Sequence, residues 1–297
     1  MDKNLQRGSL EMVAAMLISG TIGWLVLLSG QAVLDVVFWR CVFGAATLLL
    51  ICARMGFLRR GLLNRHTFAL IVLSGVAIVA NWVLLFASYS RASIAIGTAV
   101  YNVQPFILLG LAALFLGERI TLHKLAWLAV SFAGMLAIVS AHHGQGESGS
   151  EYLLGIALAL SAALMYAVAV LIIKRLRGIP PHLIALIQVS TGALLLAPVA
   201  NFTELPAGTQ AWGALLTLGV VHTGLMYVLL YGAIQKLPTA LIGALSFIYP
   251  IAAIFVDWFA FGHRLQPLQW VGVAAILLAA AGIQLGWRVG GRRVVNG

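Results

Sequence analysis

Charged side chains are scarce in this sequence: Asp, Glu, Lys and Arg make up 9% of its 297 residues. Soluble domains carry about 25% charged residues, whereas 62% of this chain is hydrophobic and its mean hydropathy is +1.03. The composition therefore excludes a soluble globular domain and predicts a protein that crosses a membrane several times. Cysteine is also rare, because only Cys41 and Cys52 occur. Both fall on one expected helix, roughly 16 Å apart at its rise per residue, so they cannot form a disulfide with each other.

The short motifs of common enzyme classes are missing. The sequence has no Gly-Lys dipeptide and hence no phosphate-binding P-loop, no His-Glu-x-x-His zinc motif and no Cys-x-x-Cys pair. His142 and His143 are adjacent, but no cluster of acidic residues accompanies them, so we interpret them as part of a solvated loop. We therefore expect no enzyme activity, no bound metal and no cofactor.

Long apolar runs without charge predict ten transmembrane helices. The expected spans are residues 10–29, 34–54, 67–90, 93–115, 122–141, 152–173, 180–200, 210–235, 238–260 and 267–287. The second span is the least regular, because Arg40 lies inside it. The first span exceeds the roughly 7–15 apolar residues of a signal peptide, so we expect it to remain in the mature protein.

The basic residues are distributed unevenly between the two sides of these spans. With the N-terminus inside, 15 of the 18 Lys and Arg residues lie on the cytoplasmic side, two lie outside and Arg40 lies within a helix. Because positively charged loops tend to stay in the cytoplasm, the sequence predicts a multi-pass protein of the cell (inner) membrane with both termini cytoplasmic. Topology thereby explains the net charge of +10, and no nucleic-acid partner is expected.

A segment of the first half recurs in the second half. Residues 101–120 read YNVQPFILLGLAALFLGERI, and residues 246–265 read SFIYPIAAIFVDWFAFGHRL. The two stretches share three identities, each 145 positions apart: Pro105 with Pro250, Gly117 with Gly262, and Arg119 with Arg264. A repeat of five helices places the second half upside down in the membrane, because five is an odd number.

This repeat predicts both the fold and the class of function. We expect an all-α integral membrane protein in which an inverted 5+5 repeat surrounds a central cavity. The repeats comprise residues 1–146 and 147–297, joined through the polar loop near 142–151. Two packings of similar free energy, each open to one side of the membrane, are typical of carriers that work by alternating access.

The residues around the repeated proline also carry a family resemblance. The stretch FASYSRASIAIGTAVYNVQPFILLGLAALFLGERITLHKLAWLAVSFAGMLAIV at 86–139 resembles the hallmark segment of EamA-type members of the drug/metabolite transporter superfamily. The second half repeats it more loosely at 231–283, and FWR at 38–40 is similar to the second helix of the family. The resemblance implies a ten-helix basket with a central cavity, most like the YddG-type amino-acid exporters. The second half departs from the pattern, because it has GHR where the first half has GER.

Pro105 and Pro250 lie near the middle of their expected helices. A proline there has no amide hydrogen and displaces the carbonyl four residues earlier, which belongs to Tyr101 in one repeat and to Ser246 in the other. A released carbonyl is costly in hydrocarbon unless it faces a cavity or a partner. These turns are therefore candidate substrate-facing walls, with packed structural kinks as the alternative.

Polar and aromatic side chains deep in the spans extend this candidate site. Asn81, Trp82 and Asn102 lie too deep to belong to an interfacial aromatic belt, and the offset of 145 positions relates Trp82 to Tyr227. The alternative for each polar residue is a hydrogen bond between helices. The predicted substrate-binding residues are Asn81, Trp82, Tyr101, Asn102, Pro105, Tyr166, Gln188, Tyr227, Ser246, Tyr249 and Pro250.

Acidic residues are absent from the middle of every expected span. Proton-coupled exporters of cations generally need an embedded carboxylate, so the sequence favours facilitated transport of a zwitterion or a modestly polar metabolite, with a histidine or a loop group left open as a coupling group. Arg40 is the main charge inside the membrane, and we expect it to form a conformation-stabilising ion pair with Asp257. The alternatives for Arg40 are a clamp for a substrate carboxylate and a side chain that reaches the outer interface.

The sequence therefore predicts a carrier that exports aromatic and other neutral amino acids, or similar small metabolites, by facilitated alternating access. Two alternatives stay open: a proton-coupled exporter of other amphipathic or cationic compounds, and a membrane receptor or assembly protein without transport activity. The expected partners are the small-molecule substrate and the lipid bilayer. Small residues such as Gly272, Ala275 and Ala279 either line a homo-oligomer contact or pack within the bundle.

Overall fold

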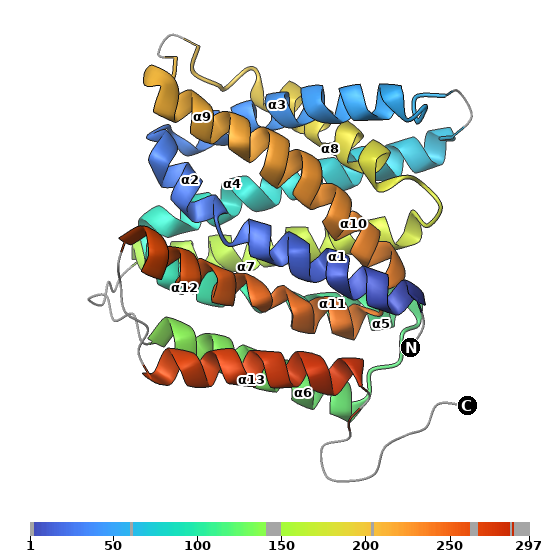
Figure 1. The fold of residues 1–297 in the computed structure, drawn as a ribbon, viewed down its shortest axis with the longest axis vertical. Helices are drawn as coiled ribbons and strands as arrows, with labels where there is room; N and C mark the ends of the chain where they lie inside the picture. The colour runs from blue at the N-terminus through green and yellow to red at the C-terminus, as the bar shows by residue number, and fades with distance from the viewer. Residues whose placement is uncertain are drawn as a thin grey trace.

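The computed structural model of the chain describes residues 3–59, 62–140, 150–202, 205–261, 267–285 and 287. The described residues form helices and short connections without any strand, so the expected all-α fold is confirmed (Figure 1). The helices in chain order are α1 (Lys3–Ser19), α2 (Ile22–Ser29), α3 (Val33–Arg54), α4 (Arg65–Tyr101), α5 (Gln104–Leu116), α6 (Leu122–Ser140), α7 (Ser150–Arg175), α8 (Pro181–Leu196), α9 (Gly208–Gly219), the π-helix η1 (Val220–Leu225), α10 (Met226–Lys236), α11 (Thr239–Ser246), α12 (Ile248–Phe261) and α13 (Pro267–Gln284).

Several of these helices are suited to a lipid bilayer. By length and composition, the stretches able to cross a membrane are Lys3–Val26, Val33–Arg54, Arg65–Ser88, Ser150–Arg175 and Gly208–Lys236. Shorter apolar helices are Gln104–Leu116, Leu122–Ala137, Pro181–Leu196 and Trp270–Ile283. Together these stretches coincide with every expected span except the ninth, which α11 and α12 divide between them. Large apolar side chains on the outside of the bundle, such as Phe259 at 90% exposure, suit contact with lipid.

Helix α4 covers the third expected span and the start of the fourth without an interruption in its helical assignment. The chain nevertheless reverses within it, because the Asn81 amide nitrogen lies 3.2 Å from the Tyr101 hydroxyl oxygen. On a straight helix, 20 residues would separate the two positions by about 30 Å. The separation of span 67–90 from span 93–115 therefore agrees with the path of the chain, although no residue between them leaves the helical state.

Two helix breaks occur at equivalent points of the repeats. Helix α4 ends at Tyr101, and α11 ends at Ser246. The first residue of each break, Asn102 and Phe247, stands three positions before the repeated proline. The proline has no amide hydrogen with which to continue the helix. The predicted loosening of the backbone at Tyr101 and Ser246 is therefore confirmed, because each is the last residue of its helix.

Two further irregularities were not predicted. Gly20 and Thr21 interrupt the first expected span between α1 and α2, where the Thr21 hydroxyl donates to the Ile18 carbonyl oxygen at 2.8 Å. Glycine weakens a helix and such hydroxyl bonds compete with helical ones. The eighth expected span contains η1, whereas the equivalent residues 75–80 of the first half lie within regular α4.

The packing of the helices follows the repeat. Helix α3 packs against its counterpart α8, and α6 packs against its counterpart α13. The contact between α1 and α10 likewise corresponds to the contact between α7 and α4. In Figure 1, α6 and α13 lie side by side at the lower edge of the bundle. Equivalent helices thus meet across a common pseudo-two-fold axis.

The pair formed by α6 and α13 shows how closely these equivalent helices approach. They run antiparallel, because Trp127 near the start of α6 donates its Nε1 hydrogen to the Trp287 carbonyl oxygen, beyond the end of α13, at 2.9 Å. A Cβ atom on Gly134 would lie 2.8 Å from the Gly272 oxygen and 3.0 Å from the Ala275 Cβ atom. Gly272 and Ala275 therefore pack against α6 within the bundle.

Candidate functional site

Trp82 of α4 and Tyr227 of α10 occupy equivalent positions of the two repeats and are in contact. Trp82 donates its Nε1 hydrogen to the Tyr227 hydroxyl oxygen over 3.1 Å. Their rings meet edge to face with centroids 5.7 Å apart, and both side chains are buried. Residues related by a two-fold operation touch only near its axis, so this pair marks the middle of the interface between the repeats.

Arg40 of α3 lies beside this aromatic pair. Its guanidinium carbon is 4.3 Å from the centroid of the Trp82 ring, within the range of a cation–π interaction. Its Nε hydrogen is donated to the Thr223 hydroxyl at 2.8 Å, and Nη2 donates to the His222 carbonyl oxygen at 3.3 Å. Both acceptors belong to η1. The π-helix therefore supplies neutral acceptors to a buried cation, and such local irregularities in helices are frequent at functional sites.

His222 connects this region to the break between α1 and α2. Its Nε2 atom lies 2.6 Å from the Thr21 hydroxyl, and its Nδ1 atom lies 3.2 Å from the Thr217 carbonyl oxygen. Because a carbonyl can only accept, Nδ1 carries a hydrogen in this arrangement. The two helical irregularities that the sequence did not predict, η1 and the α1–α2 break, thus meet at one buried imidazole.

The predicted ion pair between Arg40 and Asp257 stays a prediction. Asp257 belongs to α12, but its side chain is outside the described part of the structure. The described acidic side chains have other partners: Glu11 with Lys236, Asp35 with the backbone N–H of Asn201, Glu118 with Lys174, and Glu151 with Arg91. In this structure the guanidinium of Arg40 is held by neutral groups and aromatic faces.

Gln188 is joined to the aromatic pair through Tyr231, by a hydrogen bond and a ring contact. The ring of Tyr231 lies 5.2 Å from that of Tyr227, edge to face. The Tyr231 hydroxyl donates to the Gln188 amide oxygen, and the Gln188 amide nitrogen donates to the Ser74 hydroxyl at 2.6 Å. The predicted residue Gln188 of α8 is thereby connected to the predicted residue Tyr227 of α10.

A second group of predicted residues gathers between α4 and α7. The Asn81 amide nitrogen donates to the Tyr101 hydroxyl and, at 2.8 Å, to the Ala162 carbonyl oxygen. The Tyr101 ring contacts that of Tyr166, with centroids 6.2 Å apart. These contacts fit the alternative in which Asn81 holds helices together, and they leave a substrate role for the tyrosines untested.

The remaining predicted residues lie at or near the two helix breaks. Asn102 is buried in the first break, and Pro105 packs against Gly243, where a Cβ atom would lie 2.9 Å from the Pro105 Cβ atom. The Ser246 hydroxyl bonds within its own helix, to the Ile242 oxygen at 2.8 Å. Tyr249 packs, half buried, against the main hydrophobic core. The side chain of Pro250 is outside the described part of the structure.

Sequence reasoning did not single out two residues near these groups, His222 and Gln104. Gln104 stands 145 positions before Tyr249, which was predicted from its place beside the second proline. Applying the repeat offset to Tyr249 would have found Gln104. No comparable signal marked His222, because its partners depend on the π-helix and on the α1–α2 break.

A groove of about 410 Å³ lies between α3 and α8 near the start of α4. Most of its lining is apolar, and only Ser190 and Thr191 contribute hydroxyl groups. None of the predicted substrate-binding residues lines it. The groove is therefore distinct from the candidate site at the interface of the repeats.

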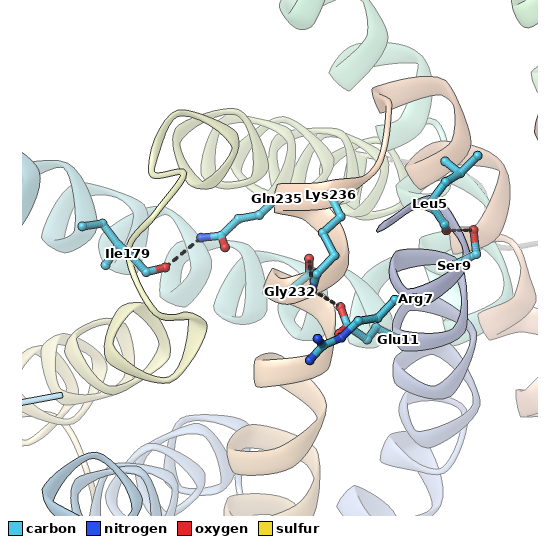
Figure 2. Close-up of polar contacts among 8 residues, drawn as sticks. All are labelled: Leu5, Arg7, Ser9, Glu11, Ile179, Gly232, Gln235 and Lys236. Carbon is cyan, nitrogen blue, oxygen red and sulfur yellow. Dashed lines mark hydrogen bonds and ion pairs between the residues drawn. The ribbon is translucent and has the colours of Figure 1, made fainter. Parts of the chain in front are cut away.

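Ion pairs between the repeats occur on the side of the bundle where α1 begins, at the right in Figure 1, which we call the N-side. Lys236 at the end of α10 is 2.5 Å from Glu11 of α1 and also donates to the Gly232 oxygen (Figure 2). Arg7 binds Glu11 from the preceding turn at 3.0 Å. The pair formed by Lys236 and Glu11 joins α1 of the first repeat to α10 of the second repeat.

Glu118, the acidic residue of the GER motif, is part of a second polar cluster on the N-side. Its carboxylate lies 2.9 Å from Lys174 Nζ, and it accepts a hydrogen bond from the Thr239 hydroxyl at 2.7 Å. Lys174 is buried at the end of α7 and also donates to the Leu237 oxygen. Partial burial acts to raise the pKa of Glu118, but bonds from Lys174 and Thr239 and the charge of Lys174 outweigh it and lower that pKa.

Comparison with known proteins identifies the family. The sequence pattern of the EamA-like transporter family matches residues 6–140 and 153–285, so its domain occurs twice in the chain. The chain belongs to this family. Its place in the family confirms the resemblance noted for residues 86–139, and the EamA-like chain is a membrane transporter.

Several named proteins are similar to this EamA-like chain over more than half of its length. The uncharacterized transporter YxxF of Bacillus subtilis is 27% identical over 273 residues, which cover 92% of this chain and 88% of the relative. Protein RarD of Streptomyces exfoliatus is 25% identical over 88% of this chain and 82% of its own. The pseudopaline exporter CntI of Pseudomonas aeruginosa is 27% identical over 63% of each chain.

The fold is shared with a solved crystal structure. That protein superposes with a TM-score of 0.79 at 19% identity, covering 92% of this chain and 95% of its own. At this identity the similarity establishes the fold alone.

Proposed function

We propose that this EamA-like protein is an inner-membrane carrier that exports aromatic and other neutral amino acids, or similar small metabolites, as the YddG-type exporters do. Transport would proceed by alternating access between inverted five-helix repeats, residues 1–146 and 147–297, around a central site, with both termini cytoplasmic. The observation that carries this proposal is the contact between Trp82 and Tyr227. An amphipathic aromatic pair contributed by both repeats supports a substrate site at their interface, where carriers built from inverted repeats bind their substrates.

The surroundings of this pair suit a zwitterion of modest size. Hydroxyl and amide groups from Tyr231 and Gln188 lie beside aromatic surface. No described acidic side chain joins this group, so it offers no carboxylate that a proton and a cationic substrate could share. Facilitated export therefore fits the site better than antiport of a cation against protons.

Proton coupling is the second candidate mode, and His222 is the observation that favours it. A buried imidazole bonded to Thr21 lies next to the guanidinium acceptors of η1. Histidine can change its charge within the physiological pH range. The same carrier could then export amphipathic or cationic compounds against protons. A receptor or assembly role without transport has no comparable observation in its favour.

The test is flux of labelled aromatic and aliphatic amino acids into liposomes that hold the purified protein, with and without a pH gradient. Asn102→Ala is the variant at the first helix break. Ser161→Ala is the matched control, because its hydroxyl is exposed on α7 and donates to the Ala157 carbonyl oxygen of the same helix. Saturable flux that ignores the gradient and falls only in Asn102→Ala supports the proposal. Flux that requires the gradient would favour proton coupling, and the absence of flux for every amino acid would overturn the amino-acid assignment.

The predicted pairing of Arg40 with Asp257 belongs to this proposal as a contact that stabilises one conformation. If the two charges pair during the transport cycle, Arg40→Asp and Asp257→Arg should each abolish flux and the double variant should recover part of it. Failure of the double variant beside a stable, folded protein would favour the alternative in which Arg40 binds a substrate carboxylate.

A further inference from the structure

The amide oxygen of Gln104 is buried and lacks a hydrogen-bond partner in the part of the chain that the structure describes. The residue is 7% exposed. The other buried amides near the candidate site are satisfied, because Asn81 bonds Tyr101 and Gln188 bonds Ser74 and Tyr231. An unpaired buried acceptor destabilises a protein and calls for an explanation.

The position of Gln104 ties it to the candidate site. It is the first residue of α5, directly after the break that begins at Asn102. The next residue, Pro105, packs against Gly243 of α11, which belongs to the other repeat. Its counterpart in the second repeat is Tyr249, also beside a proline. Gln104 therefore stands where a broken helix of one repeat meets a broken helix of the other.

We propose that Gln104 binds the substrate, with its amide carbonyl accepting a hydrogen bond from the ammonium group of a zwitterion. This inference rests on the proposed function and specifies its substrate as a compound that carries a charged amine. Hydrogen bonds between a neutral acceptor and a charged donor are strong away from water. This bond would satisfy the Gln104 oxygen only while substrate is bound. It would hold the ammonium group without a carboxylate, and no acidic residue lies in the middle of any expected span.

The structure offers a matched control for this inference. Ser131 of α6 is also fully buried, and its hydroxyl likewise has no partner among the described residues. It lies in the middle of α6, at neither of the helix breaks that follow Tyr101 and Ser246. Replacing either residue with an apolar side chain removes one unpaired polar group, so Gln104→Leu and Ser131→Ala should each leave the melting temperature of the substrate-free protein unchanged or raised.

The experiment measures the saturation of phenylalanine flux in liposomes for the wild type, Gln104→Leu and Ser131→Ala. We expect Gln104→Leu to raise KM by about tenfold or more and Ser131→Ala to leave KM unchanged. Competition by 3-phenylpropanoate, which lacks the ammonium group, should be much weaker than competition by unlabelled phenylalanine in the wild type. The two competitors should become similar in Gln104→Leu. If Gln104→Leu does not fold, Gln104→Met provides an unbranched replacement.

The outcomes separate this inference from the proposed function. Wild-type flux with an unchanged KM in a folded Gln104→Leu protein would overturn the inference alone and leave a bound water as the partner of the amide. An equal rise of KM in Ser131→Ala would also overturn it, because the effect would then be structural. Absence of amino-acid flux in the wild type would overturn the proposed function and this inference with it.

Discussion

The two sides of the bundle carry ion pairs that use equivalent basic residues but differ in length and exposure. Lys236 and Arg91 are related by the repeat offset of 145 positions, and each binds a glutamate of a helix in the other repeat. On the N-side, Lys236 and Glu11 are 2.5 Å apart with side-chain exposures of 25% and 14%. On the opposite side, Arg91 and Glu151 are 3.4 Å apart with exposures of 36% and 75%. One pair is thus short and largely shielded, and the other is long and hydrated.

Among the described residues, the N-side also has further contacts between the repeats. The N-side has a second cluster between the repeats, formed by Glu118, Lys174 and Thr239, and Arg175 also reaches the Phe115 oxygen at 2.7 Å. Residue 263, the counterpart of Glu118, is a histidine, so the opposite side cannot form the same acid–base pair. In a carrier that alternates between its sides, contacts present on one side only would favour the state in which that side is closed.

The largest effect is expected where the shielded cluster loses its acid. Glu118→Ala leaves Lys174, whose side chain is 2% exposed, as a buried charge without a counter-charge. We expect it to lower the free energy of unfolding by about 3 kcal/mol, visible as a fall in the melting temperature in detergent. Lys174→Met should cost less, because the side chain of Glu118 is 28% exposed and can be hydrated. Equal losses in the two variants would contradict this account of the cluster.

Much of the fold, but not this asymmetry, could be predicted from the sequence. Apolar runs located the spans because in hydrocarbon every backbone group must bond within its own helix, so length and hydropathy decide. The repeated proline also located the helix breaks after Tyr101 and Ser246. The π-helix η1 was missed because its register is supported by the bond from Arg40 to Thr223, which lies 183 positions away in sequence.

The candidate site was predictable to the extent that the repeat places residues together. The offset of 145 positions related Trp82 to Tyr227, and the structure brings them into contact. The same offset relates Gln104 to Tyr249. Tyr249 was predicted from its place beside Pro250, whereas Gln104, which lies beside Pro105, was not. The pairing of Glu118 with Lys174 could not be predicted, because Lys174 lies in the other repeat and no local sequence pattern indicates the contact.

Acid should weaken the N-side cluster formed by Glu118, Lys174 and Thr239. The pKa of Glu118 is lowered from its ordinary value of 4.5, so its ionised form stabilises the folded state above that pH. This contribution is lost as the pH falls from about 4.5 through the lower pKa of the folded protein. The stability difference between the wild type and Glu118→Gln should shrink over this range in thermal melts. The same comparison in a Lys174→Met background should show a smaller change, since the main partner is gone.

The ion pairs of the equivalent residues Lys236 and Arg91 provide the next comparison. Lys236→Met should lower the free energy of unfolding by about 1 kcal/mol, because the Glu11 pair is short and largely shielded, whereas Arg91→Met should change it by less than about 0.5 kcal/mol. Thermal melts of the two purified variants in detergent measure this difference. Equal losses of stability would mean that shielding does not make the N-side pair the stronger of the two.

An effect similar in size to that of Lys236→Met is expected at the axis between the two repeats. Trp82→Tyr removes the ring that the Arg40 guanidinium covers at 4.3 Å, whereas the Tyr227 ring lies 5.8 Å from that carbon. We expect a loss of about 1 kcal/mol of stability from the weaker cation–π contact and the missing indole donor. Exchanging both residues, in Trp82→Tyr with Tyr227→Trp, restores one tyrosine and one indole donor, so the double variant should recover part of that loss. A double variant as unstable as the sum of the single variants would show that Arg40 and η1, and not the pairing across the axis, dictate which repeat carries the tryptophan.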